Sequence, residues 1–259
     1  MQTQKVAEYV VNWLNRYCED ADMKGFVVGI SGGIDSAVTS TLCAKTGKPV
    51  TVVNMHIYPN AAHVDLARKH IAWLGKQFAN VTGLTLDLTA SFQAIEQVLP
   101  AGIQDDLTMA NTRSRLRMLT LYAFAGHHKL LVAGTGNKVE DFGVGFFTKY
   151  GDGGVDLSPI ADLMKSEVYE VAGQLGIIDE IITARPTDGL WDDSRSDEDQ
   201  IGASYDELEW AMQFEAAKAD ENILSDREEE VLAIYRTFNM ANRHKMEPVP
   251  VAKIPPNLK

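Results

Sequence analysis

The 259-residue chain is poor in cysteine and contains no long apolar run. Cys18 and Cys43 are its only cysteines. They form no Cys-x-x-Cys pair and lie in stretches with helical patterning, so the sequence predicts two buried thiols rather than a disulfide or a metal site. No segment approaches the roughly 20 apolar residues that a membrane helix requires. Residues 1–17 lack a basic start followed by an apolar core, so we expect a cytoplasmic protein.

Positive charge is also scarce. Lys and Arg together number 24 against 36 Asp and Glu, which gives a formal net charge of −12. A chain with this balance is not expected to coat DNA or RNA, and an anionic ligand would need a local basic pocket. The hydrophobic fraction of 45% is typical of globular proteins. The length suits one α/β domain, and we expect residues 1–259 to form it.

Short apolar runs alternate with helical periods along the chain. Residues 25–30 are nearly all apolar, as in a buried parallel strand, and further strands are predicted at 49–55, 84–88 and 129–134. Helices are predicted at 3–19, 35–45, 62–78, 92–99, 111–127, 165–175, 205–218 and 226–242. This alternation predicts an α/β fold with a doubly wound parallel sheet and ligands at the carboxyl ends of its strands. Residues 187–203 are acidic and irregular, which predicts a mobile loop.

A glycine-serine loop follows the first predicted strand. Its sequence is Gly29-Ile30-Ser31-Gly32-Gly33-Ile34-Asp35-Ser36. The glycines let the backbone approach a ligand, and the following helix directs free amides at it, as phosphate binding requires. The loop has no lysine and is not a Walker A motif, so Mg²⁺ held by Asp35, together with lysines from elsewhere, would balance a polyphosphate. The alternative is a turn in which Asp35 and Ser36 only cap the helix.

The Ser31–Ser36 segment resembles the pyrophosphate loop of the N-type ATP pyrophosphatases, which cleave ATP between its α and β phosphates. This group includes the NAD, GMP, asparagine and argininosuccinate synthetases. Three later segments resemble ammonia-dependent NAD synthetase in particular: Asn111–Met118, Leu131–Glu140 and Gly145–Asp156. The resemblance spans residues 25–245. It implies an adenine nucleotide alpha hydrolase-like fold with a helical C-terminal part.

The same resemblance implies roles for individual residues. ATP would contact Gly29, Ile30, Ser31, Gly32, Gly33, Ile34, Asp35, Ser36, Thr135, Lys165 and Thr187. Asp35 and Glu140 would hold Mg²⁺. Deamido-NAD would contact Arg115, Lys149, Asp156, His244 and Lys245, with Arg115 supplied by the second subunit of a homodimer. Each residue taken singly has a plainer interpretation, such as an exposed first-turn lysine for Lys165 or a capping carboxylate for Glu140.

The implied reaction is the amidation of deamido-NAD to NAD by ammonia, through an NAD-adenylate and with release of AMP and pyrophosphate. Asp35 and Lys165 would stabilise the charge on the reacting phosphates, and Asp152 would orient the ammonia. Two alternatives remain. A tRNA-modifying N-type pyrophosphatase is disfavoured by the acidic charge balance and the missing Cys-x-x-Cys pair. A noncatalytic ATP-binding domain is disfavoured because Asp35, Glu140 and Lys165 are all present.

Overall fold

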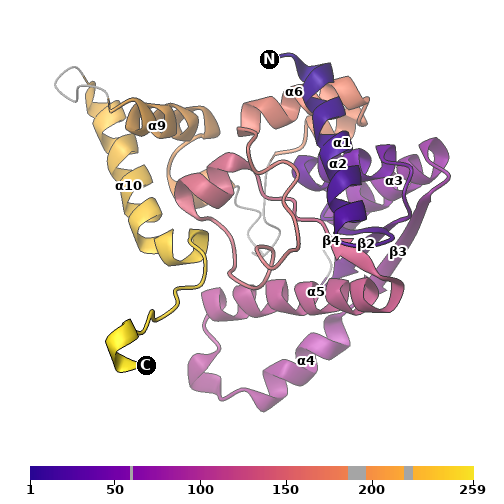
Figure 1. The fold of residues 1–259 in the computed structure, drawn as a ribbon, viewed down its shortest axis with the longest axis horizontal. Coiled ribbons are helices and arrows are strands. Elements are labelled where there is room, and N and C mark those ends of the chain that lie inside the picture. The colour runs from indigo at the N-terminus through magenta and orange to yellow at the C-terminus, as the bar shows by residue number, and fades with distance from the viewer. Residues whose placement is uncertain (59–60, 186–196, 219–223) are drawn as a thin grey trace.

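A computed structural model describes residues 1–58, 61–185, 197–218 and 224–259, with the backbone alone for 61–64 (Figure 1). The described strands form one parallel sheet in the order β3-β2-β1-β4. The strands are β1 (Gly25–Gly29), β2 (Val50–His56), β3 (Val81–Asp87) and β4 (Leu130–Val132). In the central register Phe26 is paired with Val50 on one side and with Leu131 on the other. The predicted parallel sheet is therefore confirmed.

Helices cover both faces of the sheet, because the side chains of β1 alternate between two apolar cores. Phe26 and Val28 belong to a core with α1 (Thr3–Asp20), α2 (Ile34–Lys45), α3 (Ala61–Gln77) and α6 (Lys165–Leu175). Val27 instead joins a core with α5 (Asp106–His128) on the opposite face. Strands buried on both faces need apolar residues at every position, which is why 25–30 appears in the sequence as a continuous apolar run.

A third apolar core lies beyond the sheet. It joins the wide helical turn η2 (Val139–Val144) to α8 (Asp197–Ile201), α9 (Tyr205–Ala217) and α10 (Asp226–Met246). The last two helices lie beside each other at one end of the molecule (Figure 1). The described chain also contains the short elements α4 (Thr89–Val98), η1 (Ala101–Ile103), α7 (Asp179–Ile182) and η4 (Pro256–Leu258).

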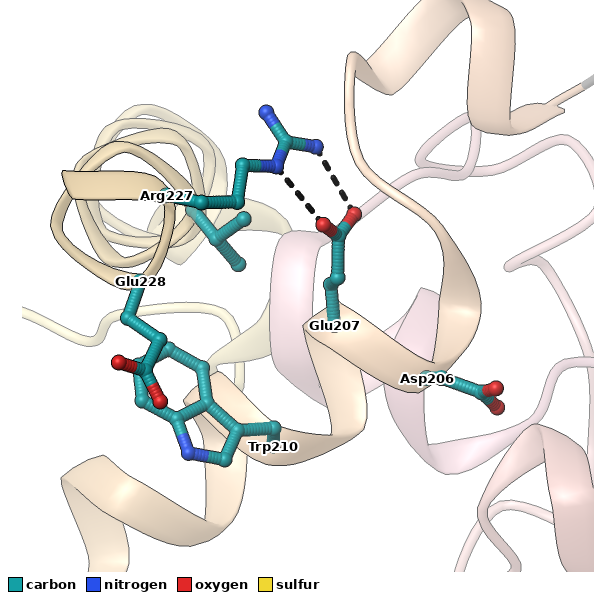
Figure 2. A pocket seen from close by; sticks show the side chains of 6 residues that line it. Asp206, Glu207, Trp210, Arg227 and Glu228 are labelled. Carbon is teal, nitrogen blue, oxygen red and sulfur yellow. Dashed lines mark hydrogen bonds and ion pairs between the residues drawn. The ribbon is translucent and has the colours of Figure 1, made fainter. Parts of the chain in front are cut away.

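An ion pair fixes α9 against α10. The Arg227 guanidinium donates two hydrogen bonds to the Glu207 carboxylate, at 2.7 and 2.9 Å (Figure 2). Both side chains line a surface hollow of about 220 Å³. The bonds from Arg227 and from the Ser204 backbone lower the pKa of Glu207 to about 2. Ser204 is also the N-cap of α9 and accepts a hydrogen bond from the Glu207 amide. The start of α9 is thereby held in place from two sides.

Several boundaries differ from the predicted ones. Helix α5 begins at Asp106, five residues early, because the Asp105 side chain caps it by accepting from the Thr108 amide. Residues 197–201 are helical rather than irregular, with three acidic residues in the first turn, where the helix dipole favours them. Residues 187–196 of the predicted loop lie outside the described part.

Cys18 and Cys43 are buried free thiols, as predicted. Within the described ranges, no helix is long and apolar enough to cross a membrane.

Candidate active site

The strand order reverses between β1 and β4. The chain leaves β1 toward β2 on one side, whereas β4 pairs with β1 on the other side, so the loops after β1 and β4 diverge at the carboxyl edge of the sheet. Ligands of open α/β sheets bind at such a switch point. The loop after β4, residues 133–138, is fixed there, since Thr39 of α2 donates a hydrogen bond to the Gly134 carbonyl at 3.5 Å. Thr135 lies in this loop.

The glycine-serine loop closes on itself at the start of α2. Gly32 has a φ of +96°, a left-handed conformation that favours glycine, and Gly33 is the N-cap of the helix. The Ser31 hydroxyl accepts from the Gly33 amide at 3.1 Å, and the Ser36 hydroxyl donates to the Gly33 carbonyl at 2.9 Å. The hydroxyls thus shape the loop. The first-turn amides of Ile34 to Ser36 have no carbonyl within the helix to bond, so they suit an anion.

The side chain of Lys165 lies between two carboxylates from distant segments. Its Nζ is 2.6 Å from Asp35 Oδ2 and 2.9 Å from Glu140 Oε1. Lys165 is only 3% exposed, whereas the two carboxylate side chains are 18% and 17% exposed. Lys165 is therefore a buried residue with two acidic partners, and not the exposed first-turn lysine of the plainer interpretation.

The local electrostatics keep this lysine charged. Burial acts to lower the pKa of Lys165, but the Asp35 and Glu140 carboxylates outweigh it and raise that pKa. Burial raises the pKa of Asp35 despite the opposing effect of Lys165. At Glu140 burial is outweighed by the ammonium of Lys165 and the hydroxyl of Tyr205, so its pKa is lowered. The single ammonium of Lys165 pairs with the carboxylates of both Asp35 and Glu140, so these three side chains together carry excess negative charge when both carboxyls are ionised.

Asn137 joins the two carboxylate segments. This fully buried side chain donates from Nδ2 to Asp35 Oδ1 at 3.3 Å, while its Oδ1 accepts from the amides of Val139 and Glu140, each at 3.1 Å. The amide group therefore fixes both the Asp35 carboxylate and the turn that carries Glu140. Sequence reasoning missed this role, although Asn137 lies inside the Leu131–Glu140 segment that carried the resemblance.

The donor set suits Mg²⁺ bound together with phosphate. Across the described ranges, no three His, Cys, Asp or Glu side chains converge closely enough to hold a metal by themselves. Mg²⁺ is commonly bound by one or two carboxylates with substrate phosphates and waters completing its shell. Asp35 and Glu140 would be those two carboxylates, at the mouth of a loop shaped for phosphate.

A family model described as "NAD synthase" matches residues 6–249. The chain belongs to this family. It is 34% identical to the NH(3)-dependent NAD(+) synthetase of Methanosarcina acetivorans, over 98% of this chain and all of that protein. It is 38% identical to the same enzyme from Carboxydothermus hydrogenoformans, over 80% of this chain and 84% of that protein.

Solved structures agree with the family. An NMN synthetase from Francisella tularensis has a TM-score of 0.84 and 29% identity, covering 98% of this chain and all of the other. An NH3-dependent NAD synthetase from Campylobacter jejuni, in complex with nitrate, has a TM-score of 0.79 and 25% identity over the same shares. The predicted adenine nucleotide alpha hydrolase-like fold is thus confirmed.

Four of the five predicted dinucleotide contacts of this NAD synthase family member lie together. Lys149 Nζ donates to the His244 carbonyl, and Lys245 Nζ donates to the Phe147 carbonyl at 2.6 Å. The Arg115 side chain is exposed and donates from Nε to the Lys149 carbonyl of its own chain at 3.3 Å. The turn at 147–151 therefore joins the end of α10 to α5.

The remaining predicted site residues are Asp152, Asp156 and Thr187, and the first two bond to other parts of the chain. Asp152 accepts from the Ser114 hydroxyl at 2.6 Å and from the Thr148 amide at 3.0 Å through the same oxygen. Asp156 accepts from the Val132 amide of β4 and from the Tyr122 hydroxyl, so both its oxygens have partners inside the chain. Thr187 lies outside the described residues.

Proposed function

We propose that the chain catalyses the ATP-dependent amidation of deamido-NAD by ammonia, as the names of its curated relatives state for those proteins. The observation that carries this proposal is the meeting of Lys165, Asp35 and Glu140 beside the phosphate loop in a chain of the NAD synthase family. A buried lysine between two carboxylates is costly as a purely structural feature, which favours a role in handling the ligand, and release of pyrophosphate separates catalysis from nucleotide binding alone.

The residues of the site suit adenylation. The nicotinate carboxylate would attack the α phosphorus of ATP, pyrophosphate would leave, and ammonia would then displace AMP from the acyl adenylate. The amides at the start of α2 would hold the departing pyrophosphate, and Lys165 would neutralise the charge that develops there. Mg²⁺ on Asp35 and Glu140 would supply further charge stabilisation to the phosphates. Asp152, which remains accessible at its turn, would orient the ammonia.

A second substrate is favoured by one specific comparison. The Francisella tularensis protein, which this chain resembles over its whole length, is described as an NMN synthetase. Amidation that yields NMN would start from nicotinate mononucleotide, which carries the same reacting carboxylate and lacks the AMP half of deamido-NAD. The two substrates would therefore use the same phosphate loop and the same Lys165 but different contacts around residues 147–151 and the end of α10.

A homodimer is part of the proposal. Leu107 and Leu119 of α5 are each 62% exposed, and Arg115 lies on the same helix. The homodimer rests on the family resemblance, in which a second subunit supplies Arg115, and these two exposed leucines lie on the helix that carries it. Sedimentation of the purified protein tests this state. A cytoplasmic location and a single domain over residues 1–259 also stay predictions.

The test is a direct assay with both substrates. The protein is incubated with ATP, Mg²⁺ and ammonium, and with either deamido-NAD or nicotinate mononucleotide, while NAD, NMN, AMP and pyrophosphate are measured. We expect NAD, with AMP and pyrophosphate in equal amounts. Asp35→Ala is expected to abolish turnover, whereas Asp162→Ala, whose side chain is 96% exposed, serves as the control. Preference for the mononucleotide would select the second candidate, and product from neither would refute both.

A further inference from the structure

Tyr205 lies at the first position of α9 and contacts both residues of the Lys165–Glu140 pair. Its hydroxyl lies beside two carboxylates, and it donates to the nearer Glu140 Oε1 while Asp197 Oδ2 is 3.2 Å away. Its ring lies under Lys165, with Nζ 4.6 Å from the ring centroid. The side chain is 6% exposed. Tyr205 is 65 residues from Glu140 in the sequence, so its contact depends on how α9 packs against η2.

We propose that Tyr205 is a positioning residue that holds Glu140 in place for the metal–ATP complex while its ring supports the Lys165 ammonium. The inference rests on the proposed function, because it assigns Glu140 and Lys165 to the ATP phosphates and their metal. Nothing in the family resemblance gave Tyr205 a role.

The position of Lys165 explains why a second support for Glu140 is needed. In the described structure the ammonium of Lys165 bonds to Glu140 and to Asp35 at once. When Lys165 turns to the phosphates of ATP, Glu140 loses this partner. The Tyr205 hydroxyl remains as a fixed donor to the same oxygen, so the carboxylate stays aimed at the metal. A hydrogen bond to a charged group is among the stronger contacts that a side chain makes.

The anchoring of Tyr205 suits a rigid support. Its backbone amide donates to Glu198 Oε1 at 2.9 Å, and the preceding Ser204 forms a capping box with Glu207. Glu207 in turn accepts both hydrogen bonds from Arg227 of α10 (Figure 2). The aromatic ring packs in the apolar core shared by η2, α9 and α10. A hydroxyl fixed through both its backbone and its ring stays beside Glu140, and the Glu140 oxygen is nearer to it than Asp197 Oδ2, the other acceptor in its reach.

Two substitutions at Tyr205 distinguish the contribution of its hydroxyl from that of its ring. Tyr205→Phe removes the hydroxyl, and with it the hydrogen bond to Glu140 and the contact with Asp197, but keeps the aromatic face under Lys165. Tyr205→Leu removes the hydroxyl and the aromatic face. Tyr235→Phe is the matched control, because Tyr235 is 7% exposed in the same apolar core but lies on α10. Thermal unfolding of each variant shows whether it folds as the parent does.

The experiment measures binding of a nonhydrolysable ATP analogue at several Mg²⁺ concentrations, and then the steady-state kinetics. For Tyr205→Phe we expect the Kd of the Mg²⁺–analogue complex and the KM for ATP to rise by about tenfold, as loss of one charged hydrogen bond implies. The KM for the nicotinate substrate should stay within about twofold of its parent value, since the change affects ATP alone. Tyr205→Leu should bind the Mg²⁺–analogue complex more weakly still, and Tyr235→Phe should bind it with the affinity of the parent.

Two outcomes would overturn the inference. One is unchanged affinity of Tyr205→Phe for the Mg²⁺–analogue complex. The other is an equal loss for all substrates accompanied by a lower unfolding temperature, which would make Tyr205 a packing residue only. The binding measurement uses no deamido-NAD, so it tests Tyr205 even if the parent protein fails to make NAD.

Discussion

Lys165 Nζ lies 2.6 Å from Asp35 Oδ2, although 130 residues separate the two in the sequence. The ammonium occupies the space between Asp35 and Glu140 in which a divalent cation would also bind. A metal bound as proposed would compete with the lysine for the same carboxylate oxygens, so removing the lysine should make the stability of the site depend on the metal.

Lys165→Met should lower the free energy of unfolding by about 3 kcal/mol in the absence of Mg²⁺, because it leaves two largely buried carboxylates unpaired. Millimolar Mg²⁺ should restore part of this loss in the variant by binding the folded state, and should change the parent less. Urea unfolding with and without Mg²⁺ measures both effects. Lys138→Met, at an exposed ion pair with Asp162, should cost less than about 1 kcal/mol. If Mg²⁺ stabilised the variant and the parent equally, the lysine ammonium and the metal would not share one position.

Asn137→Ala removes the donor to Asp35 and the acceptor for two backbone amides. We expect a loss of about 2 kcal/mol in the free energy of unfolding, and a fall of roughly 100-fold in ATP-dependent pyrophosphate release, since both carboxylates lose their alignment. Asn80→Ala is the matched control, because Asn80 donates to the carbonyls of Ala44 and Lys48 on the far side of α2. If both variants lost activity only in proportion to the unfolded fraction, Asn137 would have no alignment role.

Gly32→Ala forces a Cβ onto a residue with a φ of +96° in the phosphate loop. Gly47→Ala does the same at a φ of +76° in the turn after α2, where an added Cβ meets no other atom within 4 Å. Each substitution should cost about 1 kcal/mol of stability through backbone strain. Only Gly32→Ala should weaken binding of the ATP analogue, by at least about tenfold, because the proposed function assigns the nucleotide phosphates to that loop. If the two variants bound the ATP analogue equally well, the phosphates would have to bind outside the glycine-serine loop.

The burial of His70 leads us to predict how the free energy of unfolding depends on pH. The side chain is fully buried, its Nε2 lies 2.9 Å from the Ser40 hydroxyl, and burial lowers its pKa to about 4. The unfolded chain takes up this proton near the ordinary value of about 6.5. Between these values the unfolded state binds more protons, so stability is complete above pH 6.5 and falls as the pH drops toward 4.

The loss assigned to His70 over that range is on the order of 3 kcal/mol. His70→Gln should flatten this part of the curve, as followed by urea unfolding at pH 7, 6, 5 and 4. The exposed His127→Gln serves as control and should leave the curve of the parent protein unchanged. A curve for His70→Gln that runs parallel to the parent curve would show that other groups cause the acid sensitivity.

The parts of the fold that sequence reasoning predicted well are local in the chain. The run at 25–30, the glycine-serine loop and α2 follow one another directly, so apolar pattern, turn chemistry and helix start all act within 20 residues. Strand β3 shows the limit of this approach. It begins at Val81, three residues before the predicted start, because an edge strand with exposed alternate residues has no continuous apolar run to mark it.

The sequence by itself determined the parallel α/β architecture and the glycine-serine turn into α2, because hydrophobic period and glycine placement act between neighbouring residues. Only the tertiary structure decided that Asn137, Lys165 and Tyr205 meet the two carboxylates. Their contacts with Asp35 and Glu140 join segments up to 130 residues apart. Such contacts depend on how α6, α9 and η2 pack at the edge of the sheet, and the pattern of any one segment carries no signal for that packing.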